Sequence, residues 1–238
     1  DSVTSIGVSA FNGCAGLMHL TIPKSVTSIG SLAFRGCGIS ELTIPGNVTG
    51  IGYRAFYQCG GLKRITIESG VTSIGEGAFQ SCTGLKEAVI ENSVTSIGES
   101  AFRDCIGLSD IVIPDSVTNI GELAFYSCDA LANIYYEGDE NGWQGIQIGR
   151  NNDPLAKAAI HYNSAGLPPF IYSNSIKVVL YIPCSEYLSI KNRPKDSQVV
   201  FNMTSGNLPK GVQLNPETGD IYGVPLETGK LIFGVEVV

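Results

Sequence analysis

Cysteine is the residue type in this chain with the widest chemistry, because thiols form disulfides, bind zinc and act as nucleophiles. The chain has seven cysteines, and six recur at nearly constant spacing: Cys14, Cys37, Cys59, Cys82, Cys105 and Cys128. One thiol per repeat in a buried column would point inward, parallel to its neighbours and away from disulfide geometry. Such a column cannot surround zinc tetrahedrally, and the chain has no Cys-x-x-Cys pair. We therefore expect free, buried thiols that pack as small hydrophobic groups, and no reactive role for Cys184.

Other residues that could catalyse a reaction or bind a metal are few. His19 and His161 are the only histidines, and neither has a serine or cysteine beside it in a known catalytic arrangement. Sequence motifs of hydrolases, zinc proteases and phosphate loops are missing. The acidic loop 138–142, with Asp153, matches no calcium-binding spacing, so we expect a solvated loop. The sequence predicts no enzymatic activity, no metal site and no cofactor.

The six cysteines belong to a repeat with a period of 23 residues and a single 22. Columns of valine, isoleucine, alanine and leucine keep the same step. So do the phenylalanines Phe11, Phe34, Phe56, Phe79, Phe102 and Phe125. A period in the low twenties is too short for two packed helices and fits one turn of a leucine-rich-repeat solenoid.

The spacing inside one repeat predicts its elements. Leu20 and Ile22 are two apart, as in a strand with one buried face. Phe11, Cys14 and Leu17 are three apart, which favours a short helix. The segment before each such helix should be extended or bent. Stacked repeats, about 4.8 Å apart, would form a parallel sheet on one side and short helices on the other. Each residue then packs on its own copy, so residues that pack well on themselves recur.

The repeat unit V-T-S-I-G-x-x-A-F-x-x-C-x-G-L-x-x-I-x-I-P resembles the BspA-type leucine-rich repeat over residues 1 to about 137. Residues 138–163 resemble the degenerate last repeat of such arrays, and we expect them to cap the solenoid, with Trp143 covering its apolar end. The resemblance implies a non-catalytic protein of the extracellular space or the bacterial cell surface.

The repeats stop at residue 163, and residues 164–169 have linker composition. Alternating apolar runs follow, separated by turn signals, as in a small β-sandwich. Residues 208–225 resemble the Ig-like He-PIG module. We therefore expect two domains: a solenoid over residues 1–163, with its cap at about 138–163, and an Ig-like β-sandwich over residues 164–238.

The ends and the charge of the chain bear on its location and partners. Asp1 stands one residue before a standard repeat, so we expect a fragment of a longer protein. We also expect a monomer, apart from contacts through the uncapped first repeat. A signal peptide and an apolar run of transmembrane length are missing, which predicts no membrane insertion of this fragment. The formal net charge of −7 arises within residues 1–163 and disfavours nucleic acid.

Two functions remain open. In one, the solenoid recognises a host protein, a matrix component or a glycan, and the Ig-like module is a spacer. In the other, both domains are a structural spacer or stalk that presents a functional domain upstream of Asp1. A binding surface has to use columns that stacking leaves free, and one such column on the concave sheet face varies in every repeat. The candidate ligand-binding residues are His19, Glu41, Arg64, Glu87, Asp110, Asn133 and Tyr135. The rival surface is the helix side, which carries Tyr53, Tyr57 and Tyr126.

Overall fold

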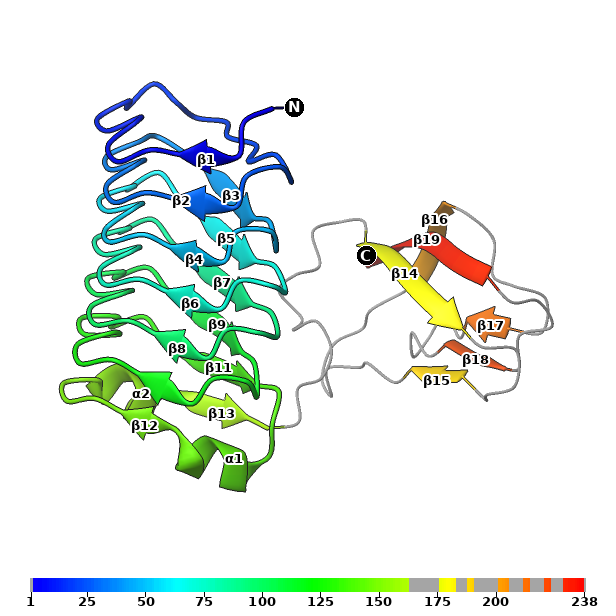
Figure 1. Ribbon diagram of the computed structural model, residues 1–238. Coiled ribbons are helices and arrows are strands. Elements are labelled where there is room, and N and C mark those ends of the chain that lie inside the picture. The colour runs from blue at the N-terminus through cyan, green and yellow to red at the C-terminus, as the bar shows by residue number, and fades with distance from the viewer. Residues whose placement is uncertain are drawn as a thin grey trace. The chain divides into compact units, whose positions relative to one another are not determined.

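The computed structural model describes residues 2–162 and, farther along the chain, the backbone of six strands between residues 176 and 237. The chain divides into two compact units, residues 1–168 and residues 169–238. The first unit is a coil of stacked turns (Figure 1). Each turn of this coil is called a rung below.

Two parallel sheets run along the coil. The longer strands form a six-stranded sheet in the order β13-β11-β9-β7-β5-β3. These strands are β3 (Glu41–Ile44), β5 (Arg64–Ile67), β7 (Glu87–Ile90), β9 (Asp110–Ile113), β11 (Asn133–Tyr136) and β13 (Ala159–His161). The second sheet has seven two-residue strands: β1 (Ser5–Ile6), β2 (Ser28–Ile29), β4 (Gly50–Ile51), β6 (Ser73–Ile74), β8 (Ser96–Ile97), β10 (Asn119–Ile120) and β12 (Gln147–Ile148). Equivalent residues face each other, as Ile74 faces Ile97, so the in-register stacking expected from the repeats is confirmed.

The core of the coil is built from columns of identical side chains. The rings of Phe11, Phe34, Phe56, Phe79, Phe102 and Phe125 stack on one another. Neighbouring centroids lie between 5.1 and 5.4 Å apart. Phe34 and the later rings are fully buried, whereas Phe11, in the first rung, is 41% exposed. Each inner rung is therefore covered by the rung before it and the rung after it.

The cysteine column lies beside the phenylalanine column. Cys37, Cys59, Cys82, Cys105 and Cys128 are buried, free thiols, and Cys14 is exposed and free. Each buried thiol donates a hydrogen bond to the phenylalanine carbonyl of the preceding rung, as Cys82 Sγ does to Phe56 O at 3.2 Å. The prediction of free, buried thiols in one column is confirmed for the five buried residues, whereas Cys14 is free but exposed, because no rung precedes its own in the described part of the chain. Cys184 lies outside the described residues.

The predicted short helices are wrong: the segments that join a short strand to the next long strand are successive turns. In the second rung, Ala33 N donates to Gly30 O and Arg35 N to Leu32 O, three residues back. Between them, Phe34 N donates to Ala55 O of the next rung at 2.8 Å. An α-helix is about 10 Å wide, twice the spacing of stacked strands, so one helix per rung would force the sheet to fan apart. A spacing of three residues fits both structures and could not separate them. These stretches are called turn segments below.

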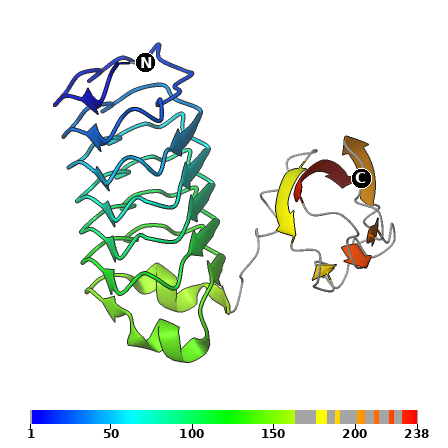
Figure 2. The same cartoon turned by 45° about the vertical axis from the view of Figure 1, so that its right-hand side comes forward.

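Residues 138–162 close the far end of the coil, which Figure 2 shows with its two helices. Helix α1 (Glu140–Gly145) begins at Asp139, whose Oδ1 accepts a hydrogen bond from Gly142 N at 2.8 Å. Trp143 of this helix is buried, and its ring meets the ring of Tyr136 edge to face at 5.3 Å. Helix α2 (Asp153–Lys157) buries Leu155 in the same core. Trp143 is thus buried against β11, as expected of a residue that covers the last rung, and the cap over residues 138–163 stays a prediction.

One buried polar side chain ends the stack of turn segments. In the inner rungs, the phenylalanine N–H donates to an alanine carbonyl of the next rung, as Phe102 N does to Ala124 O. Phe125 N donates instead to Oδ1 of Asn152 at 2.9 Å. The amide nitrogen of Asn152 donates to Gly121 O and Gly149 O, both at 2.9 Å. The side chain thus replaces the peptide group that a further rung would supply.

The opposite end of the coil is open in the described residues. Val3, Val8 and Met18 of the first rung are 55%, 70% and 60% exposed. Strand β3 is the edge strand of its sheet, because the preceding residues 19–23 form no strand beside it. The first rung is therefore the least covered part of the coil.

In the second unit, the described strands form two antiparallel sheets, β14-β19-β16 and β15-β18-β17. The strands are β14 (Ile176–Ile182), β15 (Leu188–Ile190), β16 (Phe201–Ser205), β17 (Val212–Leu214), β18 (Ile221–Gly223) and β19 (Gly229–Val237). The expected linker, 164–169, and most of the He-PIG signature at 208–225 lie outside the described residues. The Ig-like β-sandwich and the domain boundary after residue 163 stay predictions.

Candidate functional site

The candidate site is the outer face of the six-stranded sheet. Side chains alternate along each strand, so in β3 Leu42 and Ile44 are buried and Glu41 and Thr43 are exposed. The first residues of the next strands continue the position of Glu41, since the strands pair in register. Five of the seven predicted residues therefore form one row: Glu41, Arg64, Glu87, Asp110 and Asn133. This row is called the sheet-face row.

The first half of the row is an ion-pair network centred on Arg64. Arg64 Nε lies 2.6 Å from Glu87 Oε2, and Arg64 Nη1 lies 3.6 Å from Glu41 Oε1. The hydrogen bond to Glu87 raises the pKa of Arg64, so its charge is fixed. Three rungs are thereby linked across the surface by one side chain.

The second half of the row is a chain of hydrogen bonds that ends in stacked aromatic rings. Asn133 Nδ2 donates to Asp110 Oδ1 at 2.8 Å, and His161 Nε2 donates to Asn133 Oδ1 at 3.0 Å. The His161 ring also stacks on the Tyr135 ring, with centroids 4.8 Å apart. Burial and the charge of Asp110 raise the pKa of Tyr135, which keeps its hydroxyl protonated at neutral pH. Polar donors and acceptors, together with an aromatic pair, therefore lie next to one another at the capped end of the sheet.

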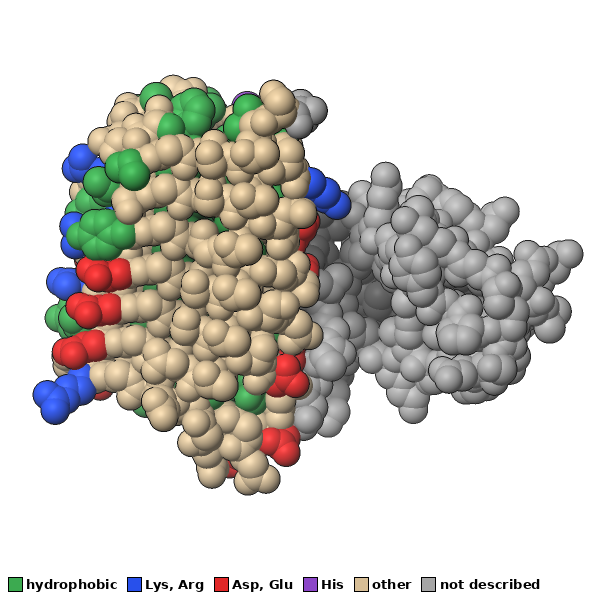
Figure 3. Space-filling view, in the orientation of Figure 1, with side chains coloured by type: hydrophobic (Ala, Val, Ile, Leu, Met, Phe, Trp, Pro, Cys, Tyr) green, Lys and Arg blue, Asp and Glu red, His purple; other side chains and the backbone are tan. Residues whose placement is uncertain are grey.

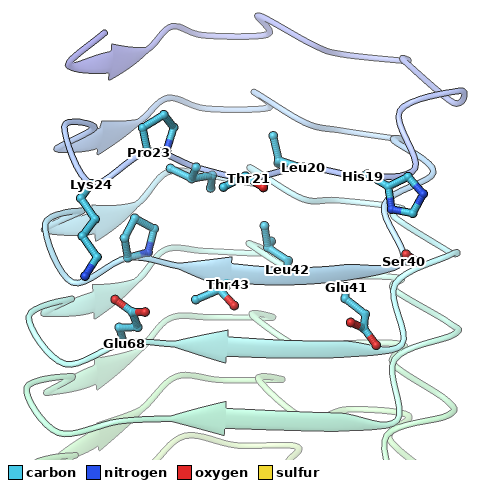
Figure 4. Close-up of a pocket in the computed structure, with 12 residues that line it drawn as sticks. His19, Leu20, Thr21, Pro23, Lys24, Ser40, Glu41, Leu42, Thr43 and Glu68 are labelled. Carbon is cyan, nitrogen blue, oxygen red and sulfur yellow. The ribbon is translucent and has the colours of Figure 1, made fainter. Parts of the chain in front are cut away.

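A groove of about 790 Å³ lies at the other end of the row, between residues 19–24 and β3 (Figure 4). His19 and Glu41 lie at one end of this groove, and Lys24 and Glu68 lie at the other. Leu20 and Leu42 contribute apolar surface between them. The structure thus places His19 with Glu41, although residues 19–23 do not continue the sheet.

Three lining or bonding residues were missed by the sequence: His161, Lys24 and Glu68. His161 faces Tyr135 across the pairing of β11 with β13, but it lies 26 residues after Tyr135, so the 23-residue period does not reveal it. In the sequence, the only sign that His161 belongs to this surface is its place at the end of a short apolar run. Glu68 comes directly after β5, and Lys24 follows residues 19–23, which form no strand; neither belongs to the column that varies in every repeat.

The described residues offer little for metal, cofactor or thiol chemistry. Within residues 2–162, no group of three or more His, Cys, Asp or Glu side chains could hold a metal ion. Burial raises the pKa of the Cys37 thiol to about 11 and that of Cys128 to about 12. Such thiols stay protonated at neutral pH and are poor nucleophiles. None of the described helices is long and apolar enough to cross a membrane.

Comparison with known proteins assigns the repeats. Six copies of the BspA-type leucine-rich repeat match residues 4–132. The T. pallidum leucine-rich-repeat protein is 32% identical, with a TM-score of 0.44, over 52% of this chain and 63% of that chain. A leucine-rich cell surface protein of Faecalibacterium prausnitzii is 28% identical, with a TM-score of 0.30, over 61% and 60%. A leucine-rich-repeat protein of Bacteroides ovatus is 25% identical, with a TM-score of 0.33, over 69% and 56%.

This chain therefore spans between 56% and 63% of the length of these three proteins. Their names describe repeat proteins and, in one case, a cell-surface protein, and none refers to a catalytic activity. No curated protein matches the chain. Because six consecutive repeats, over more than half of the sequence, fit the family's pattern, the chain belongs to the BspA-type leucine-rich-repeat family.

Proposed function

We propose that this protein is a non-catalytic recognition protein of the bacterial cell surface or extracellular space, and that it binds its ligand on the sheet-face row. The family and the name of the F. prausnitzii relative support the location. The ligand is a protein or a glycan, since the row offers charged groups and the aromatic pair of Tyr135 and His161 lies beside its capped end. The second unit would serve as a spacer.

The observation that carries this proposal is the variation of the row. Core columns repeat almost unchanged, as the phenylalanines do, because stacking dictates them. In the row, each rung differs from the one before it, and five consecutive rungs carry four residue types: Glu41, Arg64, Glu87, Asp110 and Asn133. Variation at positions that stacking leaves free is what a surface adapted to an irregular partner requires.

The side chains of the row are also held in place before any ligand arrives. Arg64 is fixed by Glu87, and Asn133 is fixed between Asp110 and His161. Ordering a long side chain on binding costs about 0.5–1.5 kcal/mol, so a row that is already ordered avoids much of this cost. Backbone strands on a packed core add to this rigidity.

The test is a screen of this chain against arrays of glycans and extracellular proteins, followed by variants. The double variant Arg64→Glu, Tyr135→Ala should weaken binding of any ligand found by at least tenfold. It reverses one charge and removes one ring without touching the core. A matched control, Arg103→Gln with Tyr126→Ala, makes similar changes on a turn segment and should leave affinity within about twofold. Binding that survives the sheet-face variant but not the control would contradict the proposed surface.

The alternative function is a structural spacer or stalk. The stack of phenylalanine rings over six rungs favours it, since such a coil is stiff along its length. In that case, the screen with this chain finds no ligand, and a longer chain that includes the neighbouring parts of the protein does. A ligand shared by both chains, with equal affinity, would exclude the spacer role.

A further inference from the structure

We propose that a second binding site lies on the turn segments of the second and third rungs, where Arg35, Tyr53, Arg54 and Tyr57 bind the oxyanion of an acidic saccharide. The anion is a sulfate ester or a carboxylate on a sugar ring. This site shares no residue with the sheet-face row and does not depend on it.

The four side chains form one cluster. The Arg54 guanidinium carbon lies 5.1 Å from the ring centroid of Tyr53 and 5.2 Å from that of Tyr57. The Arg35 guanidinium carbon, from the preceding rung, lies 5.7 Å from the same Tyr57 centroid. The two guanidinium groups are therefore no more than about 11 Å apart, with one ring shared between them. Two anionic groups on one small ligand can span that distance, and one anionic group can bind at either guanidinium.

The cluster has two positive charges without a carboxylate partner in the described part of the chain. The ion pairs there involve Arg64 and Arg103, and neither Arg35 nor Arg54 takes part. Arg54 Nε is buried and has no hydrogen-bond partner among the described residues. The aromatic rings contact guanidinium faces, which leaves the Nη N–H groups at the guanidinium edges for an acceptor.

The neighbouring rung makes room for Arg54. A Cβ atom at Gly77 would lie 2.9 Å from Arg54 Cγ and 3.4 Å from Arg54 Nε. The side chain thus lies across the backbone of Gly77, in a space that any other residue would fill.

In the fifth and sixth rungs, an arginine also contacts a tyrosine, but a carboxylate neutralises the charge of this arginine. Arg103 occupies the position of Arg35 and lies 5.4 Å from the ring of Tyr126. The next residue is Asp104, whose Oδ2 lies 3.5 Å from Arg103 Nε, whereas Gly36 follows Arg35. The lack of a carboxylate is therefore particular to the second and third rungs rather than common to every arginine on the turn segments.

The chemistry of the cluster fits an acidic sugar better than a simple ion. Guanidinium edges donate paired hydrogen bonds to oxyanions, and two guanidinium groups contact the Tyr57 ring here. Tyr53 is 40% exposed and offers a flat apolar face to the C–H groups of a sugar ring. Figure 3 shows hydrophobic and basic side chains together near the upper left edge, directly above a column of three acidic ones. In the rungs that follow Tyr53, its position is taken by Glu76, Glu99 and Glu122. These acids repel a long polyanion, so we expect a short ligand.

Titration calorimetry tests the site with four probes: a short sulfated oligosaccharide, a short carboxylated one, the uncharged parent sugar and inorganic sulfate. We expect one of the two acidic sugars to bind and its affinity to fall as salt is raised. The uncharged parent should not bind, and inorganic sulfate should bind at least tenfold more weakly than the acidic sugar. No binding of either acidic sugar, or equal binding of the uncharged parent or of inorganic sulfate, would overturn the proposal.

Variants localise the binding. The double variant Arg35→Gln, Arg54→Gln should lower the affinity for the acidic sugar at least tenfold, and Tyr53→Ala should lower it several-fold. Arg103→Gln removes an equivalent charge and should change affinity less than twofold, as should the sheet-face variant Arg64→Glu, Tyr135→Ala. Unchanged melting temperatures show that each variant is folded. An equal loss of affinity in Arg103→Gln would indicate non-specific attraction and refute the site. A loss of affinity in the sheet-face variant alone would also refute it and would show that the sugar binds at the sheet-face row.

Discussion

At the scale of single residues, the buried thiols share their acceptors with the backbone. Phe34 O accepts a hydrogen bond from Cys37 N within its own rung and another from Cys59 Sγ of the next rung. The sequence predicted a column of buried, unpaired thiols, since their spacing follows the repeat. It could not predict the S–H donors, because these depend on the direction of each side chain in a turn rather than in the helix that was expected.

The thiol column predicts that stability falls at alkaline pH. Burial raises the pKa of Cys37 to about 11 and of Cys128 to about 12, from an ordinary value of 9.0. Between these values the unfolded chain releases protons that the folded chain keeps, so the free energy of unfolding decreases as pH rises above about 9. Below about pH 9, the contribution of the buried thiols to the free energy of unfolding is fully retained. Denaturant unfolding at pH 8 and pH 10.5 measures the difference, which should shrink in Cys128→Ala. An unfolding free energy that is the same at both pH values would contradict the raised pKa values.

At the scale of elements, the sequence predicted the long strands and their parallel pairing but replaced turns by helices. Two-residue periodicity, as in Ile65 and Ile67 of β5, has one interpretation, whereas a three-residue spacing has two. Leu20 and Ile22 have the same spacing, but the strand expected there is wrong, since residues 19–23 form none. The short strands were expected only as extended segments, and pairing turns them into a second sheet. The hydrogen bonds of Asn152 at the end of the stack were not predicted either, because its side chain substitutes for a backbone group that no pattern marks.

Asn152 should therefore be the most sensitive polar residue of the cap. In Asn152→Ala, Phe125 N–H loses its acceptor in a buried place, and two carbonyl groups lose their donor. Leaving such groups unpaired costs about 1–3 kcal/mol of unfolding free energy. Asn152→Asp keeps the acceptor but sets a charge against Gly121 O and Gly149 O, and protonation at low pH should restore part of the loss. A change below about 0.5 kcal/mol in Asn152→Ala, measured by denaturant unfolding, would show that water replaces the side chain.

At the scale of the whole molecule, the rungs share their core residues but differ at the sheet face and in how far neighbouring rungs bury their cores. The sequence predicted the sheet-face row from its variation, and the structure places Glu41, Arg64, Glu87, Asp110 and Asn133 in register. The bonds among them could not be predicted, since they depend on rotamers at the surface. Whether the row binds a ligand stays a proposal.

Because inner rungs are more deeply buried than the first rung, we expect core substitutions to lower the free energy of unfolding more in the inner rungs. Phe79→Ala, in a central rung, should lower the unfolding free energy by about 3–5 kcal/mol, the usual range for a fully buried phenylalanine. Phe11→Ala should cost less than half as much, because its ring is 41% exposed and has one stacking neighbour. Thermal and denaturant unfolding of the two variants provide the comparison. Equal costs would mean that the first rung is covered in solution.

The same exposure predicts self-association. Val8 and Met18 of the open rung present apolar side chains beside Phe11, and a second copy could cover them. Sedimentation velocity should show a dimer whose fraction rises with concentration and drops sharply in Val8→Lys with Met18→Lys. A dimer that persists in this variant would have to use another surface.

In-register stacking also makes the inner rungs interchangeable. Residues 71–93 form one complete unit whose neighbours on both sides present the same core columns. Excising this unit joins Gly70 to Val94 in phase and leaves every remaining contact between rungs of a familiar kind. The shortened protein should fold and unfold cooperatively, and a chain that aggregates instead would show that the rungs are individually adapted. Gain or loss of whole units can therefore bring together surface residues that were one rung farther apart, so recombination within one gene can change this surface without point substitution.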